Sequence, residues 1–264
     1  MLFNSNSSEL LLRRLTPNEK ELIIKLIWEG VSLNKIFLLT KRRKSVLYYY
    51  YKKIKGKKYK EPQFEITFSE SEGEIVGIFA GDGSQYYAKS NGAYQVNVHF
   101  GNVPEYISYV KELYESYFGK KWAENMHVNH YPNPTYRIRV SDKKIYFFFW
   151  NYLEYVSQIK HCTVRLKTMD FPKKFKIGFL RGLLDTDGCV YTNGKYISIR
   201  YYTTSSALAE QICSLLSSLG IVSSLYRIVS KKGYKDIFVI QIWAKSKDRF
   251  LNMIKPFKAR KLGR

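Results

Sequence analysis

A nine-residue pattern occurs twice in this 264-residue chain and constrains its fold more than any other feature. The segment Ile75–Gly83 (IVGIFAGDG) recurs as Leu180–Gly188 (LRGLLDTDG), so that Asp82 and Asp187 lie 105 residues apart. Both copies are rich in apolar and small residues and end in Asp-Gly. Because a motif that recurs with similar flanking segments marks a repeated structural unit, we expect two copies of one fold.

The segments after the two motifs predict the same order of elements. After the first motif, periodic patterns predict strands and helices at Gln85–Lys89, Tyr94–Phe100, Pro104–Phe118, a strand ending at Tyr131, Tyr136–Val140 and Lys144–Val156. After the second, they predict elements at Cys189–Thr192, Tyr196–Tyr202, Ser205–Leu219, Val222–Val229, Phe238–Trp243 and from Lys247. Each half therefore predicts the order αββαββα, and the chain an α+β fold of two pseudo-symmetric repeats.

The glycines of each motif predict that the two motif helices touch. Gly77 and Gly81, like Gly178 and Gly182, lie four residues apart and so on one face of a helix. Without side chains on that face, two helices can approach backbone to backbone. The aspartates that end the motifs would then emerge together from a central pair of helices.

The paired aspartates predict a site for a divalent cation. Two carboxylates held close together repel one another, and a cation relieves that repulsion. Carboxylate oxygens suit Mg²⁺, which can activate water and stabilise the leaving oxygen of a phosphodiester. The alternative is that Asp-Gly is a common turn and the helices are plain core. The recurrence of the motif at the start of two matching halves favours a cation held by Asp82 and Asp187.

Charge predicts a polyanionic partner. The formal net charge is +22, and residues 1–60 contribute 15 Lys and Arg against 4 Asp and Glu. Neutralising phosphates with such a surface releases counterions, although a basic surface kept for solubility is the alternative.

Cys162, Cys189 and Cys213 show no CxxC spacing, and the pair His127 and His130 has no second pair, so neither zinc nor disulfides are expected. No apolar run spans a bilayer and no signal pattern begins the chain, which predicts a cytoplasmic protein.

Residues 1–60 predict three helices. Thr16 is the expected N-cap of the first helix, which ends at Gly30, and Ser32 and Thr40 are the expected N-caps of the next two. A third helix with a basic first turn is typical of a helix-turn-helix, although a plain three-helix bundle fits the same pattern. The residues expected to contact DNA here are Lys41, Arg42, Arg43 and Ser45.

Alternation along the strands predicts a polar surface that faces the nucleic acid. In the second strand of the first repeat, Val96, Val98 and Phe100 are expected to face the helices. The opposite face is expected to present Gln95, Asn97, His99, Arg137 and Arg139 in the first repeat and Ser198, Arg200, Tyr202, Arg227 and Gln241 in the second. Arg and Gln can bind base edges through two hydrogen bonds, although any half-solvated sheet alternates in this way.

These motifs resemble those of the LAGLIDADG homing endonuclease family, in its single-chain, two-repeat form. The resemblance covers about residues 70–257, and the second motif is the closer match because Ala80 occupies the position of Asp185. It implies a saddle over DNA, with divalent metal at Asp82 and Asp187 and at the adjoining Gly81 and Thr186. It further implies a monomer that cuts both strands of a long duplex site across the minor groove, leaving 3′ overhangs. Mg²⁺ is the expected cofactor, with Mn²⁺ as a working substitute.

The resemblance also implies basic residues beside the metal, in a pattern of Lys followed five residues later by Phe. Lys143 and Lys245 fit this pattern, with Lys144 and Lys247 as neighbouring choices and a solvated lysine at a helix start as the alternative. His99 and Thr203 are the corresponding polar residues expected to order water.

The sequence therefore predicts a helix-turn-helix-like domain (1–60), a linker (61–71) and two repeats (72–160 and 161–264). The expected function is site-specific cleavage of double-stranded DNA by an intron-type homing endonuclease, with an intein origin left open. Two alternatives share the fold: a DNA-binding regulator without catalysis, and an intron RNA maturase. Charge alone does not separate DNA from RNA.

Overall fold

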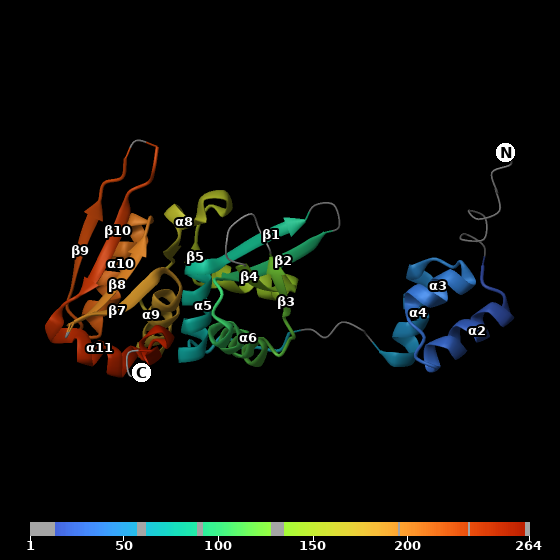
Figure 1. Cartoon of the computed structure of the whole chain (residues 1–264). Helices are drawn as coiled ribbons and strands as arrows, with labels where there is room; N and C mark the ends of the chain where they lie inside the picture. The colour runs from blue at the N-terminus through green and yellow to red at the C-terminus, as the bar shows by residue number, and fades with distance from the viewer. Residues whose placement is uncertain are drawn as a thin grey trace. The chain divides into compact units, whose positions relative to one another are not determined.

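The structure is a computed structural model of the chain and describes residues 14–56, 62–88, 92–127, 135–194, 196–231 and 233–261. The chain divides into two compact units, Met1–Glu61 and Pro62–Arg264 (Figure 1). The predicted strand end at Tyr131 and the predicted histidine partner His130 lie outside the described residues.

The first unit contains helices α2 (Pro17–Trp28), α3 (Leu33–Thr40) and α4 (Lys44–Lys55). The predicted capping box is present, since Thr16 accepts from the main chain of Glu19 and the Glu19 carboxylate accepts from Thr16 N. Ile23, Ile27, Ile36 and Leu47 form the core of this unit. Ser32 is the N-cap of α3 as predicted.

The predicted start of the third helix is wrong. Thr40 is the last residue of α3, Lys41 adopts a left-handed conformation with φ 52°, and Arg43 is the N-cap of α4. The connection therefore turns Arg42 inward, where it is 1% exposed and its guanidinium lies 2.6 Å from the Glu19 carboxylate. The predicted DNA contact at Arg42 is also wrong, because this side chain joins the α3–α4 connection to the start of α2.

The second unit contains two four-stranded antiparallel sheets with the same strand order. The first sheet has the order β1-β2-β4-β3, and the second has the order β7-β8-β10-β9. The strands are β1 (Gly83–Ala88), β2 (Ala93–Phe100), β3 (Ala123–His127), β4 (Thr135–Ser141), β7 (Gly188–Asn193), β8 (Tyr196–Thr203), β9 (Ser223–Ile228) and β10 (Ile237–Ile242). This equivalence confirms the predicted α+β fold of two pseudo-symmetric repeats.

Helices cover one face of each sheet and join the two sheets. The motif helices are α5 (Glu70–Asp82) and α9 (Lys173–Asp187), and they lie between the sheets in the predicted saddle arrangement (Figure 1). The other helices are α6 (Pro104–Phe118) and α7 (Lys143–Phe148) in the first repeat and α10 (Ser206–Ser218) and α11 (Lys247–Ile254) in the second. One hydrophobic core runs through both repeats.

The connection between the repeats differs from the prediction. The helix expected near Lys144–Val156 ends at Phe148 and continues as a short 3-10 turn, η1 (Phe149–Asn151). Strand β5 (Leu153–Glu154) then pairs with β6 (Arg165–Leu166), and α8 (Lys160–Thr163) lies between them in sequence. Phe148, Phe149, Tyr152 and Leu153 are buried, so this connection packs on the core although it is not one continuous helix.

Residues 62–69, predicted as the end of the linker, pack on the second unit. The Phe64 ring lies 5.1 Å from the Phe118 ring and 5.3 Å from the Phe148 ring, centroid to centroid. Ser69 is the N-cap of α5, and the buried Glu72 carboxylate accepts hydrogen bonds from Thr67 N and from tyrosine hydroxyls. This segment therefore fixes where α5 begins.

The two motif helices touch through their glycines. A Cβ added to Gly77 would lie 2.2 Å from Phe179 O, and one added to Gly182 would lie 2.3 Å from Glu74 O. Any side chain at these positions would collide with main-chain atoms of the other helix. The sequence prediction of a close helix pair is therefore confirmed, and it brings the C-terminal ends of α5 and α9 together.

Candidate metal centre

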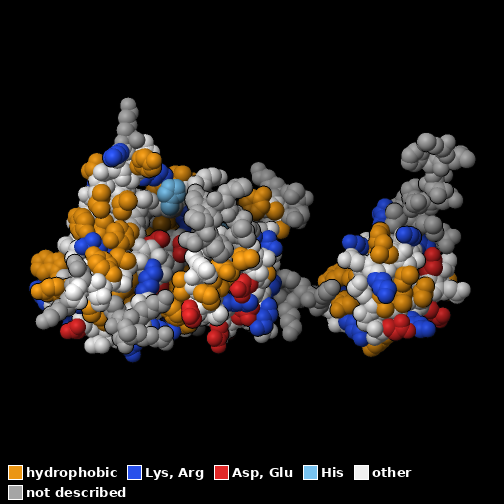
Figure 2. Space-filling view, in the orientation of Figure 1, with side chains coloured by type: hydrophobic (Ala, Val, Ile, Leu, Met, Phe, Trp, Pro, Cys, Tyr) orange, Lys and Arg blue, Asp and Glu red, His pale blue; other side chains and the backbone are white. Residues whose placement is uncertain are grey.

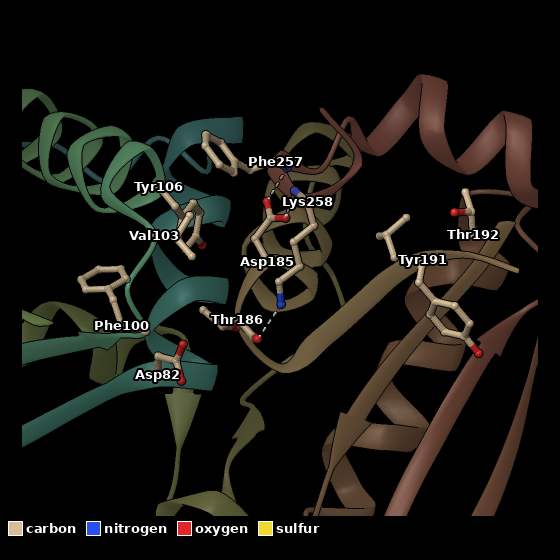
Figure 3. A pocket seen from close by; sticks show the side chains of 12 residues that line it. Asp82, Phe100, Val103, Tyr106, Asp185, Thr186, Tyr191, Thr192, Phe257 and Lys258 are labelled. Atoms are coloured by element: carbon tan, nitrogen blue, oxygen red, sulfur yellow. Dashed lines mark hydrogen bonds between the residues drawn. The ribbon is translucent and has the colours of Figure 1, made fainter. Parts of the chain in front are cut away.

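The two motif aspartates lie at the touching ends of α5 and α9. A Cβ added to Gly81 would lie 2.2 Å from Thr186 Oγ1 and 3.1 Å from Asp187 Oδ2. Asp187 therefore reaches across to the end of α5. Figure 3 shows the reciprocal arrangement, with Asp82 at the end of α5 opposite Thr186. The predicted juxtaposition of the two carboxylates is present in the structure.

Both carboxylates have raised pKa values. Burial raises the pKa of Asp82 to about 7, and the nearby charge of Asp187 adds to the effect. Burial also raises the pKa of Asp187. The positive charges of Lys160 and Lys258 act in the opposite direction on both groups. Negative charge at the helix ends is therefore unfavourable without a cation. The two lysine ammonium groups supply part of the positive charge that offsets it.

Each of these lysines binds the C-terminal end of one motif helix. Lys160 Nζ donates to Phe79 O at 2.8 Å, Ala80 O at 2.7 Å and Gly81 O at 2.9 Å. Lys258, in the 3-10 helix η4 (Phe257–Lys261), donates through Nζ to Thr186 O at 2.9 Å and Gly188 O at 2.6 Å. Cations are favoured there because the last carbonyls of a helix carry partial negative charge. Burial lowers the pKa of Lys160 to about 8.

A pocket of about 560 Å³ opens beside Asp82. Its lining includes Asp82, Asp185, Thr186 and Lys258, together with Tyr106 from α6 (Figure 3). We call this the first half-site. It combines the aspartate of one repeat with the lysine of the other.

A second pocket, of about 300 Å³, opens beside Asp187. Its lining includes Asp187, Ala80, Gly81, His161 and Thr203. We call this pocket, with the neighbouring Lys160, the second half-site. It again combines the aspartate of one repeat with the lysine segment of the other, so the two half-sites are related by the pseudo-symmetry of the repeats.

Known proteins share this arrangement of helices and sheets. Residues 174–255 match the LAGLIDADG-like domain family. The structure of I-DmoI in complex with DNA and Ca aligns with a TM-score of 0.56 at 18% sequence identity, over 75% of this chain and 99% of that one. The chain has the two-repeat LAGLIDADG fold.

Further structures with the LAGLIDADG fold also align. I-DmoI in complex with DNA and Mn gives a TM-score of 0.54 at 19% identity, over 71% of this chain and 97% of that one. I-WcaI bound to its DNA recognition sequence gives 0.50 at 18% identity, over 73% and 84% of the two chains. No curated protein matches the sequence.

The donor atoms at the LAGLIDADG helix ends fit a divalent cation. Among the residues that the structure describes, no group of three or more His, Cys, Asp and Glu could hold a metal. The two carboxylates would therefore be joined by main-chain carbonyls, water or substrate oxygens. The Gly81 and Thr186 carbonyls, predicted as ligands, each accept a hydrogen bond from a lysine ammonium here. Both carbonyl oxygens therefore point to a place where a positively charged group is bound.

The basic residues beside the LAGLIDADG motifs are not those that the sequence predicts. Lys143 Nζ lies over the Tyr94 ring at 5.7 Å, and Lys245 Nζ lies over the Trp243 ring at 5.3 Å. Lys143 begins α7 and Lys245 lies in the 3-10 helix η3 (Ala244–Ser246) just before α11, and the phenylalanines of the pattern, Phe148 and Phe250, are buried. The lysines that face the carboxylates come instead from the segments after these helices. The structure therefore places Lys160 and Lys258 beside the two carboxylates, and the catalytic role of Lys143 and Lys245 stays a prediction.

Strand register places most of the predicted contact residues on the sheet faces turned away from the helices. In the first sheet Asn97 pairs with Arg139 and His99 pairs with Arg137, while Val96, Val98 and Phe100 are buried on the helix side. In the second sheet Arg200 lies opposite Gln241. The residues that alternate as predicted are Gln95, Asn97, His99, Arg137, Arg139, Ser198, Arg200, Tyr202 and Gln241.

Arg227 departs from this pattern. It lies opposite Phe238, which packs against the core, so Arg227 is on the helix side of the sheet. Its guanidinium forms an ion pair with Asp236. The prediction that Arg227 faces the DNA is wrong, because the register of the edge strand β9 places Ser224 and Tyr226 on that face.

The predicted water-ordering residues take different positions. Thr203 lines the second half-site and accepts a hydrogen bond from Ser205 N at 3.0 Å. The His99 Nε2 atom lies 3.1 Å from Ser84 Oγ on the sheet face. None of the described helices is long and apolar enough to cross a membrane.

Proposed function

We propose that this chain is a site-specific DNA endonuclease that cuts both strands with the help of a divalent cation. The observation that carries the proposal is the pair of half-sites, each with a motif aspartate from one repeat and a lysine from the other. Duplex DNA presents two antiparallel phosphodiester strands related by local two-fold symmetry. A pseudo-two-fold pair of acidic and basic groups at the centre of the molecule matches two scissile phosphates.

The sheets supply the binding surface in this proposal. Their outward faces carry Asn97, Arg137, Arg139, Arg200 and Gln241, which can bind phosphates and base edges. Several buried polar atoms on these faces, including Asn97 Oδ1 and Ser198 Oγ, have no hydrogen-bond partner among the described residues. Buried polar groups of this kind are normally paired, so a ligand that pairs them is expected.

The cation would be held by Asp82 and Asp187, with the carbonyls of Gly81 and Thr186 as further donors. When bound, it would lower the pKa of water and offset charge on the phosphate. Lys160 and Lys258 would stabilise negative charge on the two phosphates through the positive charge of their ammonium groups. Mg²⁺ is the proposed ion and Mn²⁺ a working substitute, in keeping with the DNA complexes of I-DmoI that contain Mn or Ca.

The N-terminal unit adds a second DNA contact in this proposal. Residues 14–56 hold 11 Lys and Arg against 3 Glu, and Lys and Arg are spread over the face of this unit in Figure 2. Lys41, Arg43 and Ser45 are exposed and lie at the start of α4. Assignment of this unit as a helix-turn-helix stays a prediction, as do the domain boundaries at 1–60, 61–71, 72–160 and 161–264.

The test is cleavage of a randomised duplex library with Mg²⁺, followed by sequencing of the cut ends. The expected result is one long pseudo-palindromic site with 3′ overhangs, and no cleavage with Asp82→Asn or Asp187→Asn although DNA binding is retained. Binding of a specific duplex without any cleavage by the wild-type protein would instead identify a regulator. Binding of RNA in preference to DNA would identify a maturase.

A further inference from the structure

The two half-sites differ in how their lysines are held. The Asp185 carboxylate is 4% exposed and accepts hydrogen bonds from Phe257 N at 2.8 Å and Lys258 N at 2.9 Å (Figure 3). It thereby fixes the main chain of the segment that carries Lys258. The Lys258 ammonium is fixed separately by the carbonyls at the end of α9. Lys258 is therefore held at both its main chain and its side chain.

The equivalent anchor is missing from the second half-site. Ala80 occupies the motif position of Asp185, and its methyl group cannot accept a hydrogen bond from the segment that carries Lys160. The Lys160 ammonium still binds three carbonyls at the end of α5. The two lysines thus make equivalent contacts through their ammonium groups, but only the Lys258 segment is anchored by a motif carboxylate.

A second difference concerns the hydroxyl of Tyr106. Tyr106 is the third residue of α6, and its side chain lines the first half-site, where its buried hydroxyl has no hydrogen-bond partner among the described residues. The third residue of α10 is Leu208, which has no polar group to offer. The first half-site therefore contains two polar groups, Asp185 and Tyr106, that the second lacks.

We propose that Asp185 is a positioning residue for Lys258 and serves the cleavage of only one DNA strand. The proposal rests on the proposed nuclease function. In each half-site water adds to phosphorus, the bond from phosphorus to the 3′ oxygen breaks, and that oxygen takes up a proton. Displacement of Lys258 weakens charge stabilisation most in the first half-site, whose lining includes this lysine. Loss of the Asp185 carboxylate therefore converts the double-strand endonuclease into a strand-specific nickase.

The test compares strand cleavage by Asp185→Asn, Lys258→Met and Lys160→Met on a supercoiled plasmid that carries one selected site. Asn keeps the shape of Asp but offers one acceptor oxygen in place of two. We expect Asp185→Asn to slow one strand by about 10²-fold, the effect of misplacing a group by ~1 Å, so that nicked circles accumulate. Lys258→Met must slow the same strand and Lys160→Met the other. Asp170→Asn, an exposed aspartate outside the half-sites, is the matched control and must cut both strands normally.

Hydrogen exchange of the metal-free protein gives a readout that does not depend on cleavage. The Phe257 and Lys258 amides must lose protection in Asp185→Asn, while the amides of the β8–β10 ladder keep theirs. Equal slowing of both strands by Asp185→Asn, or slowing of different strands by Asp185→Asn and Lys258→Met, would overturn the positioning role while the nuclease function stands. A wild-type protein that cuts neither strand would overturn both.

Discussion

Replacement of Asp82 by Asn is expected to stabilise the metal-free protein at neutral pH while it abolishes cleavage. Burial and the neighbouring Asp187 raise the pKa of Asp82 from 3.8 to about 7. A raised folded-state pKa means that the folded protein binds the proton more tightly than the unfolded chain does. The stability this contributes is complete below pH 3.8 and is lost as the pH rises to about 7.

The size of the effect follows from that shift. Each pKa unit corresponds to about 1.4 kcal/mol, so ionisation of Asp82 lowers the free energy of unfolding by about 4 kcal/mol between pH 4 and pH 8. Asn does not ionise and carries no such loss. The advantage of Asp82→Asn over wild type is therefore expected to grow by about 3 kcal/mol between pH 5 and pH 8.

Urea unfolding of both proteins in EDTA, at pH 5 and pH 8, measures this difference. The N-terminal unit is identical in the two proteins and cancels in the comparison. Added Mg²⁺ is expected to stabilise wild type but not the variant, because a ligand that binds only the folded state adds to its stability. Parallel pH profiles of the two proteins in EDTA would refute the conclusion that charge at Asp82 is unfavourable.

Three further predictions concern the helix contact of the second unit, the buried ion pair of the first unit and the part of the first unit in DNA binding. Gly182→Ala is expected to lower the free energy of unfolding by about 3 kcal/mol in urea titrations, because its Cβ would lie 2.3 Å from Glu74 O; Gly101→Ala, with open space around its Cβ, is the control and is expected to unfold as wild type does. Arg42→Ala is expected to expose the first unit to limited proteolysis, whereas Arg43→Ala leaves it resistant; equal sensitivity would argue against the buried ion pair. Deletion of residues 1–61 is expected to reduce DNA affinity and its salt dependence in binding titrations without moving the cut position.

Sequence reasoning predicts features of this fold that depend on local patterns. The glycine spacing of the motifs predicts the contact of α5 with α9, because the identity of a residue without a side chain is visible in sequence. The predicted helix Pro104–Phe118 matches α6 residue for residue, since proline begins it and Gly119 ends it in a left-handed conformation. Such signals lie within one element and need no knowledge of its neighbours.

The residues that sequence reasoning missed depend on contacts between distant segments. Lys160 and Lys258 reach the motif helices from the ends of their repeats, 79 residues beyond Gly81 and 72 residues beyond Thr186. No spacing pattern within one segment of the sequence shows that these lysines contact the motif helices. Asp185 does give one sign of the Lys258 segment, because a carboxylate in an apolar motif needs hydrogen-bond donors from elsewhere in the chain. Arg42 carries no such sign, because a basic residue in a basic segment does not show that Glu19 binds it.

In a single chain the two motif helices can differ in sequence. Here they differ in residues that stabilise the helix pair as well as in residues of the half-sites. Arg181 bridges Glu70 and Glu74 across the α5–α9 contact and donates to Ile254 O at 2.6 Å. Its counterpart in the first motif is the buried Val76, so the bridge exists once. In a symmetric dimer every such residue would occur twice. The difference between Ala80 and Asp185 has the same origin, so under the proposed nuclease function a single chain can tune the cutting of each strand separately.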